Sequence, residues 1–431
     1  MILFKGSVLN SNETDHVLNI LSGELIQTLT GPGIDANLVV NACNILAKKI
    51  ESGTYQDLIA ELIQKKLLDQ EQIDVVIRLL KKECLIYKLK TELGSRWSKD
   101  AELTPPGSSL HKKVRFAPIG VLFHIAAGNM EGLPFYSVIE GLLAGNINLV
   151  KLPSVDQGLS IQLLQELIKI EPRLAEYIYV FDTPSTDLDT LKKMADLADA
   201  IIVWGGDVAI KAARKFVPVN KQIITWGHKI SFAYLTEDGL RECEQDLYDL
   251  ARHIFETKQL LCSSCQGIYV NNKDQKKVEE FGEKFFRILE EVSREYERPD
   301  IGVQAQITLQ LYNQELVVLN ESKKIYKAVG CSVISSTDST LETSFLFGNC
   351  WIKPLPQLEI IKKLYPHRGY LQTVGLICGE EERELITNIL LKAGVTKVTY
   401  AKEMSSMICG EAHDGEYPLR RYSRVVSVDK K

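Results

Sequence analysis

The sequence lacks the long apolar run that a membrane-spanning helix needs, since no uncharged stretch approaches roughly 20 residues. Its first residues also lack the basic start, apolar run and small-residue cleavage site of a secretory signal. Charge of one sign is not in large excess, because 51 Lys and Arg residues stand against 56 Asp and Glu residues. We therefore expect a cytoplasmic protein without a membrane span and without nucleic acid as a partner.

Cysteine occurs in a pattern that fits neither a disulfide framework nor a zinc site. The nine cysteines are an odd number and are scattered along the chain, which is typical of reduced thiols. Cys262 and Cys265 form a C-x-x-C pair, but no second C-x-x-C or H-x-x-x-H completes four zinc ligands. We expect reduced cysteines and no bound metal.

The first part of the chain, residues 1–112, is predicted to be a mostly helical region that packs on the domain after it. Residues 36–52 and 54–93 carry apolar side chains at three- and four-residue spacing, with Lys and Glu between them. The Pro-Pro-Gly-Ser-Ser run at 105–109 breaks that pattern and predicts a crossing loop.

The rest of the chain is predicted to form two doubly wound α/β domains. In residues 113–229, short apolar segments alternate with amphipathic ones, as in IGVLFHIAA, NINLVKL, YIYVF and AIIVWGG. Such continuous apolar strands between helices indicate a parallel sheet covered on both faces, in the manner of a Rossmann-like nucleotide-binding domain. A second series over residues 230–400 carries Cys262, and residues 401–431 end in a further strand, RRYSRVVSVDKK.

Three segments of the nucleotide-binding domain carry candidate binding residues. Trp204-Gly205-Gly206 ends a strand before a helix, where glycines let backbone approach a phosphate, but the G-x-G-x-x-G fingerprint is absent and a tight turn is the simpler explanation. Asn129 follows another strand and is either an oxyanion-hole donor or a helix N-cap. Lys151 ends a strand and either contacts a ribose or phosphate or is a solvated charge.

The pair Cys262 and Cys265 has four interpretations: a zinc half-site, a redox pair, buried inert thiols, or one nucleophile with a neighbour. The zinc ligands are incomplete, and a thioredoxin-like pair stands at a helix N-terminus, whereas these cysteines follow a helix and precede a strand. Buried thiols and a nucleophile at a turn both stay open on the residues alone.

Five segments carry these candidates in order: FAPIGVLFHIAAGN, NLVKLP, IIVWGG, ITWGHK and QLLCSSCQGIYV. Together with the tail GEAHDGEYPLRRYSRVVSVD, they resemble the aldehyde dehydrogenase superfamily, and within it the acyl-CoA reductase branch of LuxC-type fatty-acid reductases. The resemblance covers residues 115–428 approximately. It implies an aldehyde-dehydrogenase-like fold with two doubly wound domains, a tail that returns to the cofactor domain, and a homo-oligomer to which the strand VVSVD contributes.

The resemblance implies that Cys262 is the catalytic nucleophile, because the family's cysteine falls on it, while Cys265 occupies a position that the superfamily does not require to be Cys. Asn129 falls on the oxyanion-hole asparagine. The implied reaction is reduction of an acyl thioester to an aldehyde through an acyl-Cys262 intermediate, with NAD(P)H as the source of hydride.

The same resemblance implies how the cofactor is held. Lys151 falls on the lysine that holds the adenosine ribose, and Gly205 on the glycine that packs against the cofactor, with Trp204 and Gly206 beside it. Ser154 stands where NAD-preferring members often have a carboxylate. Because a serine does not repel a 2′-phosphate, we expect NADPH, with NADH as the alternative.

Two segments depart from the superfamily pattern. The E-L-G-G-K segment, whose glutamate activates water, is replaced by Thr225-Trp226-Gly227-His228-Lys229, and Thr225 cannot act as that base. His228 is either a proton-transfer group or an orienting or exposed residue. The E-x-F-G segment appears as Phe345-Leu346-Phe347-Gly348, so the carboxylate that grips the nicotinamide-side ribose is missing.

The implied acyl donor is a fatty acyl-CoA or an acyl group on a carrier thiol, with an acyl-protein synthetase as a candidate partner. Two other functions stay open. One is a CoA-acylating aldehyde dehydrogenase that works in the oxidising direction, and the other is an inactive member that serves as an assembly or acyl-channelling subunit. The missing ribose carboxylate favours the inactive subunit, whereas the retained Cys262 and Asn129 argue against it.

Overall fold

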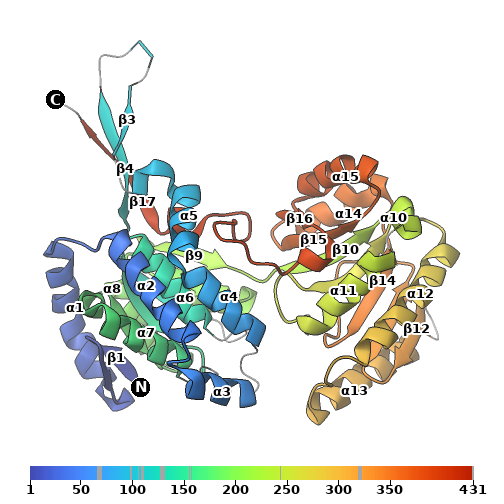
Figure 1. Ribbon diagram of the computed structural model, residues 1–431, viewed down its shortest axis with the longest axis horizontal. Helices are drawn as coiled ribbons and strands as arrows, with labels where there is room; N and C mark the ends of the chain where they lie inside the picture. The colour runs from blue at the N-terminus through green and yellow to red at the C-terminus, as the bar shows by residue number, and fades with distance from the viewer. Residues whose placement is uncertain are drawn as a thin grey trace. The chain divides into compact units, whose positions relative to one another are not determined.

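A computed structural model describes residues 1–65, 70–97, 100–104, 106–107, 111–126, 132–154, 156, 158–242, 244–318 and 323–429. The chain divides into two compact units: unit 1 consists of Met1–Gly227 and Met407–Lys431, and unit 2 of His228–Ser406. Each unit contains a seven-stranded sheet with helices packed on it (Figure 1), which confirms the predicted α/β class. No helix of the described residues is long and apolar enough to cross a bilayer.

The sheet of unit 1 has the strand order β2-β1-β7-β6-β5-β8-β9. Its strands are β1 (Ile2–Phe4), β2 (Ser7–Leu9), β5 (Val121–Ile125), β6 (Ile147–Lys151), β7 (Ile178–Phe181), β8 (Ala200–Trp204) and β9 (Gln222–Trp226). Strands β5 to β9 run parallel, with β6 and β7 on one side of β5 and β8 and β9 on the other. The strand order therefore reverses at β5, and ligands of doubly wound sheets bind at the carboxyl ends of the strands at such a point.

The hairpin of β1 and β2 extends this sheet in the antiparallel direction at the edge strand β7. The sequence pattern did not predict it, because three-residue strands contain no continuous apolar run long enough to stand out.

The helices of unit 1 pack on its sheet or on one another. They are α1 (Thr14–Thr30), α2 (Ala36–Glu51), α3 (Gln56–Gln64), α4 (Gln70–Leu80), α5 (Lys82–Leu93), α6 (Leu133–Leu143), α7 (Leu159–Ile170), α8 (Leu188–Leu197), α9 (Asp207–Phe216) and α16 (Pro418–Arg421). Helix α2 shows how the sequence encodes them: Asp35 caps its N-terminus by accepting from the Asn37 N–H at 2.8 Å. Its buried residues recur at helical spacing and pack on α6 and α7.

A second, smaller sheet of unit 1 joins β3 (Ala101–Leu103), β4 (Lys112–Pro118) and the C-terminal strand β17 (Ser423–Asp429). Strand β17 pairs with β4 along its whole length, from Ser423 opposite Pro118 to Asp429 opposite Lys112. This sheet projects from the body of unit 1 (Figure 1). The tail thus forms the expected final strand.

The sheet of unit 2 has the strand order β12-β13-β14-β11-β10-β15-β16 and is parallel except for β12. Its strands are β10 (Ile230–Leu235), β11 (Cys265–Val270), β12 (Lys323–Ala328), β13 (Cys331–Ser336), β14 (Asn349–Pro354), β15 (Leu371–Ile377) and β16 (Lys397–Thr399). Its helices are α10 (Glu237–Glu242), α11 (Glu244–Glu256), α12 (Gln275–Ser293), α13 (Ile301–Val318), α14 (Ile360–Leu364) and α15 (Glu380–Ala393).

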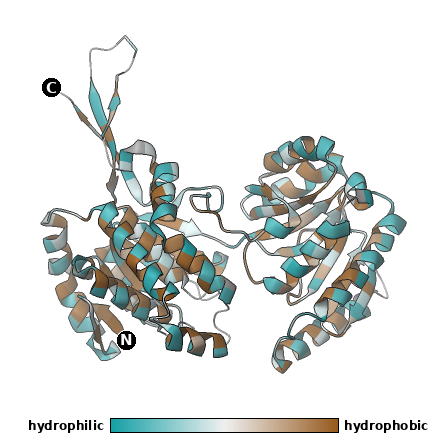
Figure 2. Cartoon of the chain, in the orientation of Figure 1, coloured by the Kyte–Doolittle hydropathy of each residue, from teal (hydrophilic) through white to brown (hydrophobic). Residues whose placement is uncertain are grey.

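Two apolar cores lie on opposite faces of this sheet. Ala233 and Leu235 of β10 belong to the core that contains α11 and α12, whereas the alternate residues Phe232 and Tyr234 belong to the core that contains α14 and α15. Because successive side chains of a strand point to opposite faces, helices cover both faces. Figure 2 shows the same pattern in each unit, with hydrophobic strands inside and hydrophilic outer faces of the helices.

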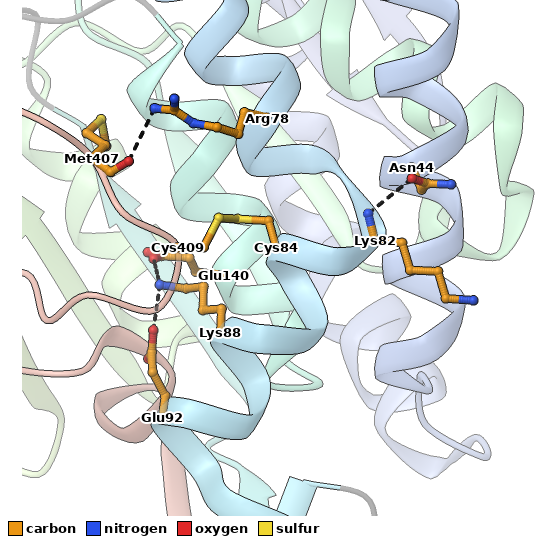
Figure 3. Close-up of a disulfide and its surroundings, with 9 residues drawn as sticks. All are labelled: Asn44, Arg78, Lys82, Cys84, Lys88, Glu92, Glu140, Met407 and Cys409. Carbon is orange, nitrogen blue, oxygen red and sulfur yellow. Dashed lines mark hydrogen bonds and ion pairs between the residues drawn. A yellow bond between two sulfur atoms is a disulfide. The ribbon is translucent and has the colours of Figure 1, made fainter.

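One expectation about the cysteines is wrong. Cys84 of α5 and Cys409 form a disulfide, with Cα atoms 5.3 Å apart although 325 positions separate the two residues in the chain (Figure 3). The other described cysteines form no disulfide. Sequence spacing could not reveal the pair, because only the return of the tail to unit 1 brings Cys409 next to α5.

Candidate active site

Cys262 lies in the turn between α11 and β11 of unit 2. The backbone of this turn has φ angles of 51° at Lys258 and 61° at Gln259, in the left-handed region that residues other than glycine rarely adopt. Residues held in such conformations cluster at active sites, where surrounding contacts stabilise them.

The side chain of Gln259 supplies those contacts and is only 2% exposed. Its Nε2 donates to the Cys265 carbonyl at 2.9 Å, and its Oε1 accepts from the Gly348 N–H at 3.1 Å. Its backbone carbonyl accepts from Gln266 Nε2 at 3.0 Å. Gln259 therefore ties the turn to the start of β11 and to the segment before β14.

A serine of β10 holds the backbone of Cys262 and is itself held by β15. Ser231 of β10 donates its hydroxyl to the Cys262 carbonyl at 2.7 Å, and the same hydroxyl accepts from the Thr373 N–H of β15 at 3.0 Å. Cys262 itself is half-buried at the turn, two residues before the buried Ser264. Hydrogen bonds from the sheet thus fix a thiol that is not enclosed by the core.

Cys265 has a different environment, because it is the first residue of β11 and is fully buried. Its Sγ donates to the Gly267 carbonyl at 3.2 Å. Burial raises the pKa of Cys265 to about 12, so it stays a neutral thiol at physiological pH, and the thiol is a poor nucleophile. The buried-thiol interpretation therefore fits Cys265.

His253 lies beneath this turn and was not singled out in the sequence. Its Nε2 accepts from the Cys265 N–H at 3.2 Å, and its carbonyl accepts from the Thr257 N–H at 3.1 Å. Burial lowers the pKa of His253 to about 4, so the ring is neutral and carries its proton on Nδ1. A histidine in the last turn of a helix gives no sequence signal for such a supporting role.

The segment Phe345-Leu346-Phe347-Gly348, which departs from the superfamily pattern, contacts the same turn. Leu346, Phe347 and Gly348 have φ angles of 64°, 49° and 86°. The Phe347 N–H donates to the Lys258 carbonyl at 3.2 Å. At Gly348 an added Cβ would lie 2.5 Å from Cε1 of Phe255, so only glycine fits there.

Among the residues that the structure describes, no group of three or more His, Cys, Asp or Glu side chains could hold a metal ion. The C-x-x-C spacing therefore has no zinc partners within that part of the chain, and one of its cysteines lies inside the core.

In unit 1, Lys151 ends β6 and is only 3% exposed, which does not fit a solvated strand-end charge. Its Nζ donates to Ser185 Oγ at 2.8 Å, and burial lowers its pKa. Ser154 follows in an exposed turn. The Lys151 amine and the hydroxyls of Ser185 and Ser154, at the carboxyl edge of the sheet, are groups that can form hydrogen bonds with the hydroxyls of a ribose.

The glycines after β8 meet a geometric need. Gly205 has φ of 151°, and an added Cβ would lie 3.0 Å from the Cβ of Ala209, so glycine lets α9 pack close to the strand end. Gly206 is the N-cap of α9 and provides no side chain to cap it. A helix N-terminus at this edge favours an anion, although Asp207 in the first turn opposes it. These features fit a dinucleotide.

Thr225 and Trp226 end β9, and the tail of the chain packs on them. Arg421 lies over the Trp226 ring at 4.7 Å and donates to the Thr225 carbonyl at 3.2 Å. Trp226 Nε1 donates to the Tyr422 hydroxyl at 3.1 Å. Gly227 follows as the last residue of this part of unit 1, and His228 is exposed.

Asn129, the predicted oxyanion-hole residue, lies outside the described residues. Strand β5, which precedes it, ends at Ile125, and the Ala126 N–H donates to the Lys151 carbonyl at 3.3 Å.

Solved structures share this architecture. The glyceraldehyde-3-phosphate dehydrogenase GapN from Methanocaldococcus jannaschii, complexed with NADP, matches with a TM-score of 0.73 at 12% identity, over 98% of this chain and 95% of that one. The putative aldehyde dehydrogenase PutA from Anabaena variabilis matches with a TM-score of 0.70 at 15% identity, over 98% and 94% of the two chains. The protein therefore has the aldehyde dehydrogenase fold.

Sequence relatives narrow this class. The acyl-CoA reductase (LuxC) family model matches residues 33–425. The long-chain acyl-protein thioester reductase 2 of Photobacterium leiognathi is 24% identical over 98% of this chain and 89% of its own. The long-chain acyl-protein thioester reductase of Vibrio harveyi is 25% identical over 83% of this chain and 73% of its own. The chain belongs to the acyl-CoA reductase (LuxC) family, as the resemblance predicted.

Proposed function

We propose that this protein reduces an acyl thioester to the aldehyde, with NADPH as reductant and an acyl-Cys262 intermediate. The observation that carries the proposal is the contrast between two neighbouring thiols, Cys262 in the turn and Cys265 at the start of β11. Cys262 is half-buried and held by the sheet, whereas Cys265 is buried with a raised pKa. The family and the names of its curated relatives supply the substrate class.

The chain's own residues perform the acyl transfer. The Cys262 thiolate attacks the thioester carbonyl, and the bond to the donor thiol breaks as the bond to Cys262 forms. We assign the negative oxygen to the Asn129 amide and the Cys262 backbone N–H. A bound nicotinamide cofactor would supply hydride. Cys262 would hold the acyl group while the hydride reduces it to a thiohemiacetal, whose C–S bond then breaks to release the aldehyde and the Cys262 thiolate.

We assign the cofactor to unit 1. Lys151 and Ser154 would hold the adenosine ribose and tolerate its 2′-phosphate, and Trp204, Gly205 and Gly206 would pack against the dinucleotide. The segment Thr225-Trp226-Gly227 would complete this binding surface without a water-activating base. Because Thr225 cannot deprotonate water, the acyl-enzyme would persist until it is reduced.

The proposed donors are acyl-CoA or an acyl group on a carrier thiol, in the cytoplasm. An acyl-protein synthetase is the proposed partner for the second source, since the curated relatives are named as acyl-protein thioester reductases. We further propose that β17 contributes to a homo-oligomer, because Val425 and Val428 are exposed on this projecting strand.

Mass spectrometry of the intact protein after incubation with a panel of acyl-CoAs, without reductant, tests this function. We expect a stable acyl adduct on wild type and on Cys265→Ala, and no adduct on Cys262→Ala. Addition of NADPH should then remove the adduct and release aldehyde. An adduct that depends on Cys265 would contradict the nucleophile, and an adduct that NADPH cannot remove would indicate an acyl-channelling subunit instead.

A further inference from the structure

Three aromatic rings meet at the carboxyl ends of β8 and β9 in unit 1. Trp204 and Trp226 end the two strands and are register partners, with ring centroids 5.4 Å apart and planes inclined by 26°. His413, from the tail, contacts both rings at centroid distances of 5.4 and 5.1 Å. We call Trp204, Trp226 and His413 the ring cluster. It joins residues from two distant parts of the chain.

The ring cluster stands beside the point where the strand order reverses. Strand β8 is the neighbour of β5 on one side, and Lys151 ends β6, the neighbour of β5 on the other side. A dinucleotide on a doubly wound sheet spans the crevice at this point, with one half on each side. If Lys151 and Ser154 hold the adenosine half, the nicotinamide half lies over β8 and β9, where the ring cluster is.

The turn that carries His413 is held in an unusual conformation. The His413 N–H donates to the Glu416 carbonyl at 2.8 Å, and the Glu416 N–H donates back to the His413 carbonyl at 2.9 Å. Within this turn Asp414 has φ of 52°, a left-handed angle for a non-glycine residue. The His413 side chain is 41% exposed, so a ligand can reach the ring, whose Nε2 also lies 3.8 Å from Oδ2 of Asp414.

Contacts on both sides of His413 fix this turn to helices of unit 1. Before it, Cys409 is bonded to Cys84 of α5, and Arg78 of α4 donates to the Met407 carbonyl at 3.2 Å (Figure 3). After it, the Leu419 N–H donates to Oε2 of the buried Glu92 at 2.7 Å. The imidazole is therefore presented by an anchored segment and not by a loose tail.

We propose that His413 binds the nicotinamide half of the cofactor and donates a hydrogen bond to its ribose. This role rests on the proposed function and supplies what Phe345 cannot, because Phe345 stands where the superfamily has its ribose carboxylate. An imidazole carries at least one N–H donor in either protonation state, and such a donor suits a ribose hydroxyl.

Isothermal titration calorimetry of the full chain with NADPH, and separately with adenosine 2′,5′-bisphosphate, tests the assignment. The second ligand has the adenosine half and lacks the nicotinamide half. His413→Ala should raise the Kd for NADPH about three- to ten-fold, the loss of one hydrogen bond, and leave the Kd for the bisphosphate unchanged. His413→Phe keeps a ring against the tryptophans and should be as weak as His413→Ala. His16→Ala, at an exposed histidine of α1, is the matched control and should bind both ligands as wild type does.

Three outcomes overturn the assignment. Wild-type affinity of His413→Phe for NADPH would show that the ring only fills the cluster. Equal weakening of both ligands in His413→Ala would show a structural role. Normal NADPH binding by His413→Ala would exclude any contact. Different results would contradict the proposed function: a wild-type chain that is not acylated on Cys262, or one that binds neither NADPH nor NADH.

Discussion

The turn that carries Cys262 and the ring cluster of unit 1 are built in opposite ways. In the turn, Gln259 contacts groups six and seven positions further along the chain, and its side chain is buried. In the ring cluster, His413 reaches the two tryptophans from the far end of the sequence, and its side chain is partly exposed. A nucleophile must be held in one position, and buried hydrogen bonds hold it there. A surface for a cofactor that binds and leaves can be assembled from distant segments, provided that something anchors them.

Removal of the Gln259 side chain should give the largest effect in this comparison. Gln259→Ala leaves the Cys265 carbonyl and the Gly348 N–H without their partners, which costs about 4 kcal/mol in the free energy of unfolding. Because the turn then relaxes around Cys262, the acylation rate should fall about 100-fold. Urea unfolding and single-turnover acylation measure the two effects. Gln245→Ala, at an exposed glutamine of α11, is the control, and an equal loss in both variants would refute the role of Gln259.

Acid should weaken both units through one buried histidine each. Burial lowers the pKa of His124 in β5 and of His253 beneath the turn to about 4, against 6.5 for a free histidine. The unfolded chain therefore binds these protons first, and stability falls as the pH drops from about 6.5 to about 4, by roughly 3 kcal/mol for each histidine.

Hydrogen exchange followed by mass spectrometry resolves the two units and checks this pH dependence. His124→Gln should flatten the profile of unit 1 only, and His253→Gln that of unit 2 only. His16→Gln, at an exposed histidine, should change neither profile. A profile that both core variants leave as steep as in wild type would assign the acid sensitivity to other groups.

The smallest expected effect is on cofactor choice. Ser154→Asp places a carboxylate in the exposed turn after Lys151, where it would repel a 2′-phosphate. Because water screens this charge, we expect the Kd for NADPH to rise only about ten-fold, with the Kd for NADH nearly unchanged. Ser154→Ala should alter neither value by more than about two-fold. A wild-type protein that already prefers NADH would contradict the assignment of Ser154.

The sequence predicted those features that depend on a few consecutive residues. Parallel strands such as β5 and β8 are continuous apolar runs, so their place between helices could be read directly. The order of five short segments was enough to predict the family, which the family model confirms. The roles of Cys262 and Lys151 stay predictions, although the half-buried thiol and the buried amine fit them.

Features that depend on two distant segments could not be predicted. The Cys84–Cys409 bond and the contact of His413 with the tryptophans exist only because the tail folds back onto unit 1. Gln259 was missed for two reasons: only the left-handed turn directs its amide back onto the nearby Cys265 carbonyl, and its other partner, Gly348, lies far along the chain. Neither residue spacing nor helix and strand propensity predicts such a left-handed backbone conformation.

The division of the chain has a consequence for its synthesis on the ribosome. Unit 2 is one continuous segment, inserted between the two pieces of unit 1. Domains tend to fold as they emerge from the ribosome. All strands of unit 2 are therefore synthesised before residues 407–429, which unit 1 needs to complete its fold. During that interval β4 has no β17 beside it, and Cys84 lacks its disulfide partner Cys409. The nascent chain thus exposes an open edge of β4 until β17 is synthesised.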